Sequence, residues 1–261
     1  MSDIPITIGI VTFKERKEIV QKLIKDIRLH EGDDFDILLM INGNNEEEVD
    51  NDYRTDMLTF CSNIKKCYPF FFPEFKSLSK LWNNIVIFSK TEYNFIICDD
   101  VIYNNPNILK TVKKVIDETK LEMFKINNEF SHFVLTKNIL HKIGYFDERL
   151  LSHGEEDADM IYRYQQYTKT GFANVNISGI HNDARYDLKN KHSENHIHNK
   201  PIVNRKIAEL MYKEDQNGMS IMGGALIKKQ WENIQQYPYE LFINKNKHNI
   251  KKFTTLDISY E

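Results

Sequence analysis

Two hydrophobic periods alternate along the first part of the chain, and this pattern restricts the fold more than any other feature of the sequence. A β-branched apolar run at residues 6–13 has the composition of a buried strand. The next segment, 15–28, places apolar residues three and four apart, as a helix with one buried face requires. Residues 36–41 form a second apolar run, which turn-forming residues at 42–44 end. Strands that alternate with helices are typical of a mostly parallel sheet with helices on both faces, so we expect an α/β fold.

The same reading predicts further elements along the chain. A helix is expected at 77–89, a strand at 93–98 and a helix that Pro106 opens. Beyond residue 120 the pattern loosens into shorter elements: strands at 122–126, 132–137 and 173–180, and helices at 138–143 and 158–167. We therefore expect one domain over residues 1–190 and a polar C-terminal extension over 191–261, with candidate helices at 205–213 and 226–233.

Composition excludes several classes of protein. The 41% apolar and 28% charged content over 261 residues is that of a globular protein with a sizeable core, and a net charge of −3 gives no electrostatic reason to expect nucleic acid as the main ligand. The three cysteines form no CxxC pair, which indicates free thiols in a reducing compartment. The N-terminal residues lack the layout of a signal peptide, and the longest apolar runs are strand-sized, so we expect a cytoplasmic protein without a membrane span.

Two adjacent carboxylates, Asp99 and Asp100, directly follow the predicted strand at 93–98. In an open α/β sheet, ligands bind beyond the carboxyl ends of the strands. Neighbouring carboxylates repel one another there and lose hydration, and a bound Mg²⁺ or Mn²⁺ would offset both costs. The alternative is a solvated turn, because Asp is common where strands end.

A second acidic segment, residues 147–159, carries six carboxylates. A helix start accounts for part of it, because Ser152 and Glu155 have the spacing of a capping box and the helix dipole favours acids in the first turn. It does not account for the acids at 156–159 as well. The second interpretation is therefore a general base, since an ordinary carboxylate is ionised at neutral pH and can accept a proton.

Together the two acidic segments resemble the family 2 glycosyltransferases of GT-A fold, in the style of bacterial polysaccharide-synthesis enzymes that use nucleotide-diphosphate sugars. FIICDDVIYNNP (95–106) resembles the family's Asp-x-Asp region. IGYFDERLLSHGEEDADMIYRY (143–164) resembles its Gly-x-Phe-Asp-Glu sequence, followed by a Glu-Asp pair and a helix. The resemblance covers roughly residues 4–182. It implies a Rossmann-like GT-A domain with a nucleotide-binding half at about 1–105 and an acceptor half at about 106–190.

The resemblance implies a role for individual residues. Asp100 is similar to the family's metal-ligating last acid, Asp99 to an acid that contacts ribose or metal, and His181 to a histidine that completes the metal or pyrophosphate site. Asp157 resembles the catalytic base, and Glu156 its neighbour. Further nucleotide-sugar-binding positions implied in this way are Thr12, Phe13, Asn42 and Asn83.

Lys76, with Lys80 nearby, is a candidate for neutralising the diphosphate, although a solvated surface lysine is the alternative for each. Three positions depart from the family pattern. Cys98 stands where the first acid of an Asp-x-Asp sequence would be, and Ile41 stands where an Asp is common in the second strand. The usual glycine in the loop before the metal strand is absent.

The resemblance implies a metal-dependent, inverting hexosyl or related transferase. An acceptor hydroxyl attacks the anomeric carbon, Asp157 takes its proton, and Mn²⁺ or Mg²⁺ stabilises the leaving nucleoside diphosphate. Glu156 and Asp159 would tune or orient the base, and Asp147 and Glu148 would hold the preceding turn. The sequence does not name the sugar, the base or the acceptor, of which a glycan or a lipid-linked sugar is favoured, and an oligomer is possible.

Two other functions stay open. A non-catalytic nucleotide- or sugar-binding protein would keep the same fold, and a nucleotidyltransferase would share the sheet and the acids. The latter would carry a glycine-rich loop after the first strand, where this chain reads TFKER. His192, His196 and His198 have a spacing that suits zinc, but a polar surface loop is the competing interpretation; in the family this stretch resembles a loop that closes over the donor sugar.

Overall fold

The computed structural model describes residues 4–43, 50–74, 76–148, 150 and 156–183. These residues fall into two compact units, each described by itself. The first, here called the sheet unit, contains residues 4–43, 50–74, 76, 81–143 and 171–183. The second, here called the helix unit, contains residues 77–80, 144–148, 150 and 156–170.

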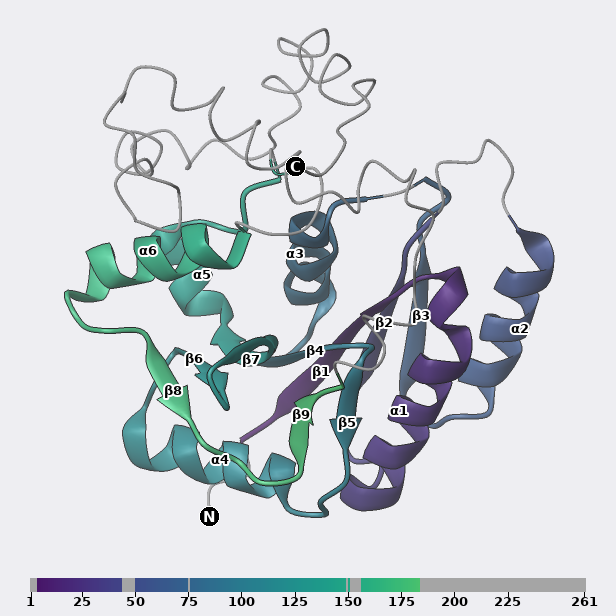
Figure 1. Cartoon of the computed structure of the whole chain (residues 1–261), viewed down its shortest axis with the longest axis horizontal. Coiled ribbons are helices and arrows are strands. Elements are labelled where there is room, and N and C mark those ends of the chain that lie inside the picture. Colours follow the sequence, from purple (N-terminus) through teal and green to yellow (C-terminus); the bar gives the residue numbers. More distant parts are fainter. Residues whose placement is uncertain (1–3, 44–49, 75, 149, 151–155, 184–261) are drawn as a thin grey trace, which may run out of the picture. The chain divides into compact units, whose positions relative to one another are not determined.

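Seven strands of the sheet unit form its main sheet in the order β3-β2-β1-β4-β7-β6-β8 (Figure 1). The four strands β3, β2, β1 and β4 are parallel to their neighbours, so their carboxyl ends meet at one edge of the sheet. β7 runs antiparallel to both β4 and β6. This mostly parallel sheet confirms the predicted α/β class. The strands are β1 (Ile6–Thr12), β2 (Ile37–Ile41), β3 (Cys67–Phe71), β4 (Tyr93–Cys98), β6 (Met123–Ile126), β7 (Glu129–Thr136) and β8 (Ala173–Val175).

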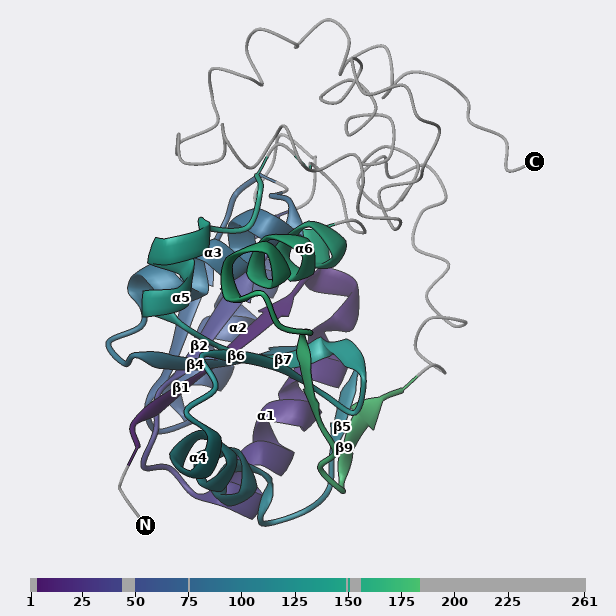
Figure 2. The same cartoon turned by 90° about the vertical axis from the view of Figure 1, so that its left-hand side faces the viewer.

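Helices cover both faces of the sheet (Figure 2). On one face, α1 (Lys17–Glu31) and α4 (Ile108–Thr119) bury apolar residues at helical spacing in one core with the sheet. On the other face lie α3 (Leu78–Phe88), which enters the sheet unit at residue 81, and α5 (Lys137–Ile143). The ring of Trp82 in α3 packs edge-on against Phe133 of β7, with 5.1 Å between the ring centroids. The predicted helices at 77–89, at 138–143 and after Pro106 are thereby confirmed.

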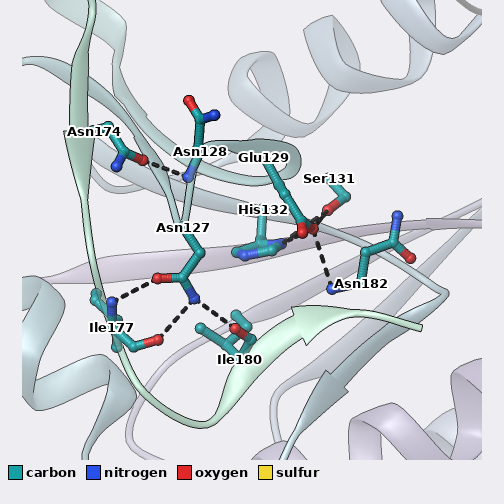
Figure 3. A network of polar contacts seen from close by, with 9 residues as sticks. All are labelled: Asn127, Asn128, Glu129, Ser131, His132, Asn174, Ile177, Ile180 and Asn182. Atoms are coloured by element: carbon teal, nitrogen blue, oxygen red, sulfur yellow. Dashed lines mark hydrogen bonds and ion pairs between the residues drawn. The ribbon is translucent and has the colours of Figure 1, made fainter. Parts of the chain in front are cut away.

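The predicted strand at 173–180 is wrong, because this segment forms two strands in different sheets. β8 ends at residue 175, and β9 (Ile180–Asn182) pairs antiparallel with the short β5 (Val101–Tyr103) in a second sheet. Gly179 lies at the turn between them with φ of +87°, a conformation that glycine adopts at little cost. The side chain of Asn127 holds this turn: its amide accepts from Ile177 N at 2.8 Å and donates to the carbonyls of residues 177 and 180 (Figure 3).

Three elements had no counterpart in the sequence reading: α2 (Asn51–Ser62), β3 and β5. α2 buries only Met57 and Cys61, so its helical stripe is narrow, and β3 carries Pro69, which is tolerated on the edge strand of a sheet. None of the described helices is both long enough and apolar enough to cross a membrane. The predicted extension at 191–261 and its three histidines lie outside the described residues.

The close contact between β1 and α3 allows a test of the packing. A Cβ added at Gly9 would lie 2.2 Å from Ile85 Cγ2, which is far inside contact distance. We expect Gly9→Ala to lower the free energy of unfolding by about 1–3 kcal/mol, as overpacking in a core does, measured by urea denaturation. Gly171→Ala is the matched control, because nothing lies within 4 Å of its added Cβ. Equal stability of the two variants would contradict this packing, and the penalty should shrink in an Ile85→Ala background.

Candidate functional site

The two acids that follow β4 are buried, and an arginine from a neighbouring strand end lies between them. Asp99 and Asp100 are 4% and 8% exposed. The register of β1 and β4 pairs Val11 with Cys98, so the short 3₁₀ helix after β1, Lys14–Arg16, begins beside the acids. Arg16 Nη1 lies 2.9 Å from Asp99 Oδ1 and 2.9 Å from Asp100 Oδ2. One guanidinium nitrogen therefore contacts both carboxylates.

The charges of this triad depend on one another. Burial raises the pKa of Asp99 to about 6; the charge of Arg16 works against this rise and that of Asp100 adds to it. Burial by itself would lower the pKa of Arg16, but the charges of the two acids and the hydrogen bonds to them outweigh it, so the pKa stays above its ordinary value. With all three groups ionised, the triad carries a formal charge of −1.

The carboxylate oxygens that do not pair with Arg16 suit a divalent cation. Asp99 Oδ2 and Asp100 Oδ1 are buried and have no hydrogen-bond partner among the described residues. Within the same residues, no three His, Cys, Asp or Glu side chains form a group able to hold a metal ion. Mg²⁺ commonly takes only one or two carboxylates from a protein and completes its shell with phosphate oxygens and water. The two acids therefore fit such an ion, provided that a phosphorylated ligand contributes the remaining ligands.

Three further side chains, from β1, from the residue after it and from α2, lie near the triad. Thr12, at the end of β1, is fully buried; its hydroxyl makes no hydrogen bond of good geometry within the described part of the chain, but it lies near enough to Asp99 to lower the pKa of that acid. The guanidinium of Arg16 lies over the ring of Phe13, 5.3 Å from its centroid. The buried hydroxyl of Tyr53 in α2 likewise has no hydrogen-bond partner there; burial raises its pKa, and the charge of Asp99 raises it further.

Asn42, predicted to bind the nucleotide, holds a loop in place. Its Oδ1 accepts hydrogen bonds from Lys76 N at 2.8 Å and Gly43 N at 3.1 Å, and its Nδ2 donates to Lys76 O at 2.8 Å. Lys76 Nζ pairs with Glu74 at 3.0 Å. Asn83 is fully buried in α3. Nucleotide-sugar binding by these residues stays a prediction.

His181 lies in β9 of the second sheet, shortly before Asp183, whose backbone contacts that of Asp100. His181 is exposed on β9, opposite Ile102 of β5, and Asp183 N donates to Asp100 O at 2.9 Å. This hydrogen bond joins the backbone just after β9 to the backbone of the acid pair. A metal-binding role for His181 itself stays a prediction.

A polar network that was not predicted from the sequence lies beside β9 (Figure 3). His132 of β7, opposite Ile97 of β4, is fully buried, and its Nδ1 lies 2.9 Å from Ser131 Oγ. Glu129 Oε2 accepts from Asn182 N at 3.2 Å, which ties β7 to β9. Burial lowers the pKa of His132 to about 4, although the charge of Glu129 acts in the opposite direction. The imidazole is therefore neutral at pH 7.

The helix unit contains the second acidic segment, and ion pairs account for two of its carboxylates. α6 (Glu156–Thr168) buries an i,i+4 pair, in which Arg163 donates to Asp159 Oδ2 from Nε at 2.9 Å and from Nη2 at 2.5 Å. Glu148 pairs with Lys80 at 2.9 Å. These contacts give both acids an ion-pair partner, while the predicted roles of Glu148 in the preceding turn and of Asp159 in orienting the base stay predictions.

Asp157 and Glu156, the predicted base and its neighbour, lie in the first turn of α6. Asp157 is half-buried and accepts a hydrogen bond from Ala158 N at 2.8 Å, whereas Glu156 is 4% exposed. Acids in this first turn are stabilised by the helix dipole. Their catalytic roles stay predictions.

Comparisons with known proteins support the fold. No family model and no curated protein matches the sequence. Among solved structures, the mannosyltransferase PcManGT from Pyrobaculum calidifontis, in complex with GDP-Man and Mn²⁺, is similar with a TM-score of 0.54 at 9% identity, covering 97% of this chain and 84% of that one. Glucosyl-3-phosphoglycerate synthase from Mycobacterium tuberculosis, in complex with Mn²⁺, UDP and glucosyl-3-phosphoglycerate, is similar with a TM-score of 0.51 at 10% identity, covering 78% and 79%.

S. aureus TarS is similar as well, with a TM-score of 0.54 at 12% identity over 89% of this chain. The chain spans only 43% of that TarS structure. At these identities the likeness shows that the chain has the fold of these proteins.

The buried His132 gives the stability of the protein a specific pH dependence. Its folded pKa of about 4 lies below the ordinary value of 6.5, so its contribution is fully present above pH 6.5 and is lost as the pH falls toward 4, because only the unfolded chain takes up the proton. Between pH 7 and pH 5 we expect wild type to lose about 2 kcal/mol more unfolding free energy than His132→Gln, measured by urea denaturation. His141→Gln, which changes an exposed histidine, should behave as wild type; parallel pH profiles of all three proteins would refute the assignment.

Proposed function

We propose that this protein transfers a sugar from a nucleotide-diphosphate donor to an acceptor hydroxyl, with a divalent cation and with inversion at the anomeric carbon. The observation that carries the proposal is the buried pair Asp99–Asp100 at the carboxyl end of β4, which leaves one oxygen of each acid without a hydrogen bond among the described residues. The edge at which parallel strands end is where α/β sheets bind ligands. The likeness to structures that hold Mn²⁺ with GDP-Man or with UDP supports the same assignment.

Each part of the site has a role in this proposal. Asp99 and Asp100 would hold the cation, and Thr12, at the end of β1, with Phe13 after it, would contact the nucleoside. When bound, the cation supplies positive charge to the diphosphate as it leaves. Asp157 accepts the proton of the acceptor hydroxyl, and its position in the first turn of α6 favours its ionised form.

The finer assignments follow from the sequence resemblance. We propose a family 2 enzyme of GT-A fold that transfers a hexose or a related sugar to a glycan or a lipid-linked sugar, in polysaccharide biosynthesis and in the cytoplasm. A protein that binds nucleotide sugars without turnover would need the same cation and diphosphate contacts. It would differ only in lacking a base, so the two functions separate at Asp157.

Nucleotide and metal binding is the first test of the proposal. A ligand at a hundredfold its dissociation constant adds about 2.7 kcal/mol to stability, which raises the melting temperature of a protein of this size by about 5 °C or more. We expect such a shift with one of UDP, GDP, CDP and TDP in the presence of Mn²⁺, and a much smaller one after Mn²⁺ is removed. Asp100→Asn should abolish the part of the melting-temperature shift that depends on Mn²⁺. No response to any diphosphate, with or without Mn²⁺, would remove the basis of the proposal.

Loss of the base is the second test. We expect Asp157→Asn to lower the release of nucleoside diphosphate from the matching donor sugar by about 10²–10⁴-fold, while the thermal shift with Mn²⁺ and nucleotide stays at the wild-type value. Asp159→Asn is the contrasting variant: its carboxylate pairs with the buried Arg163, so its main effect should be a lower melting temperature. Wild-type turnover in Asp157→Asn would rule this residue out as the base. The absence of turnover in wild type with every donor and acceptor would favour a binding protein.

A further inference from the structure

We propose that Arg16 is the built-in counter-ion of the Asp99–Asp100 pair, and that it opposes entry of a divalent cation until a diphosphate arrives with that cation. The inference rests on the proposed function, because it concerns the same pair of acids. It adds a residue to the site and an order of binding: the cation and the nucleotide enter together.

The geometry places a positive charge between the two carboxylates. A single nitrogen, Arg16 Nη1, lies 2.9 Å from an oxygen of each acid. An atom that contacts one oxygen of each carboxylate is in the position of a bridging cation. The guanidinium thus performs part of the task of a metal ion, since it offsets the repulsion between neighbouring acids.

Burial makes this counter-ion necessary. The side chains of Arg16, Asp99 and Asp100 are 11%, 6% and 11% exposed, so water screens their charges poorly. Two ionised carboxylates in such a place need a cation, and Arg16 supplies it when no metal ion is bound. The ring of Phe13 beneath the guanidinium adds a cation–π contact in the same position.

The same charge works against a metal ion that arrives alone. A divalent cation at Asp99 Oδ2 and Asp100 Oδ1 would share both carboxylates with Arg16, and two positive groups that share two acids in a buried site repel each other. The triad, with a formal charge of −1, offers a divalent ion less attraction than two uncompensated carboxylates would. Metal binding without nucleotide should therefore be weak.

A nucleoside diphosphate removes this conflict. Its phosphate oxygens bring negative charge for both cations and give the metal ion the ligands that the described residues lack. A guanidinium is also well suited to phosphate oxygens, to which it donates paired hydrogen bonds. Arg16 can then contact the diphosphate while the acids take the metal ion.

The decisive measurement is Mn²⁺ affinity without nucleotide, from the electron paramagnetic resonance signal of free Mn²⁺. We expect Arg16→Met to bind Mn²⁺ at least tenfold more tightly than wild type, and Arg16→Lys, which keeps the charge, to stay close to wild type. Lys17→Met is the matched control, because this neighbouring lysine pairs with Asp56 at 2.8 Å and not with the two acids. Adding Asp100→Asn to Arg16→Met should abolish the gain and so locate it at this pair.

Equal or weaker Mn²⁺ binding by a folded Arg16→Met, judged by circular dichroism, would overturn the inference. If that variant does not fold, wild type alone decides: saturating nucleoside diphosphate should tighten Mn²⁺ binding at least tenfold, and unchanged affinity would overturn the inference. The proposed function fails separately. If wild type responds to a diphosphate with Mn²⁺ but Arg16→Met gains nothing, only the role of Arg16 is lost, whereas no response to any diphosphate removes both.

Discussion

The ion triad of Arg16, Asp99 and Asp100 is the interaction on which the candidate site depends. It joins the turn after β1 to the end of β4, two neighbouring strands in the parallel part of the sheet. Without it, two adjacent carboxylates would lie almost fully buried next to each other with no positive charge between them, which is costly in a poorly hydrated site. The triad therefore allows two buried carboxylates at the end of β4 to stay ionised, so that both can bind a ligand.

Around this centre the backbone is held by an amide side chain, a carboxylate side chain and one backbone hydrogen bond rather than by long elements. Asn127 fastens the turn before β9, Glu129 accepts from a backbone amide of β9, and Asp183 N donates to the carbonyl of Asp100. Each bond joins segments about fifty or more residues apart in sequence. A short strand such as β9 has few ladder hydrogen bonds of its own, so these side chains position the chain that leads from the acids toward His181.

The sequence was most informative where one hydrophobic period persists. The strands at β1, β2 and β4 and the helices α1 and α4 were predicted because long apolar stripes specify them. α2 and β5 were missed because the first has a narrow apolar stripe and the second has only three residues.

At the site, the acid pair was visible because it follows a buried strand directly. Arg16 was findable in principle, since it follows the neighbouring strand in the parallel order, whereas Tyr53 and His132 reach the site region through contacts that no local pattern encodes. The pairing of Asp159 with Arg163 has the i,i+4 spacing of a helix and was within reach of the sequence as well.

The hydrogen bonds by which Asn42 holds the loop at Lys76 require an amide, because an ionised acid can accept but cannot donate. The nitrogen of Asn42 donates to one carbonyl while its oxygen accepts from two backbone amides, and Gly43 beside it has no room for a side chain, because an added Cβ would lie 2.5 Å from Phe72 O. Asn-Gly is also the dipeptide in which asparagine most readily deamidates with age. The product, an aspartate, could still accept but would turn an oxygen toward the carbonyl of Lys76, so slow chemical ageing of a single side chain would release the loop that follows β3.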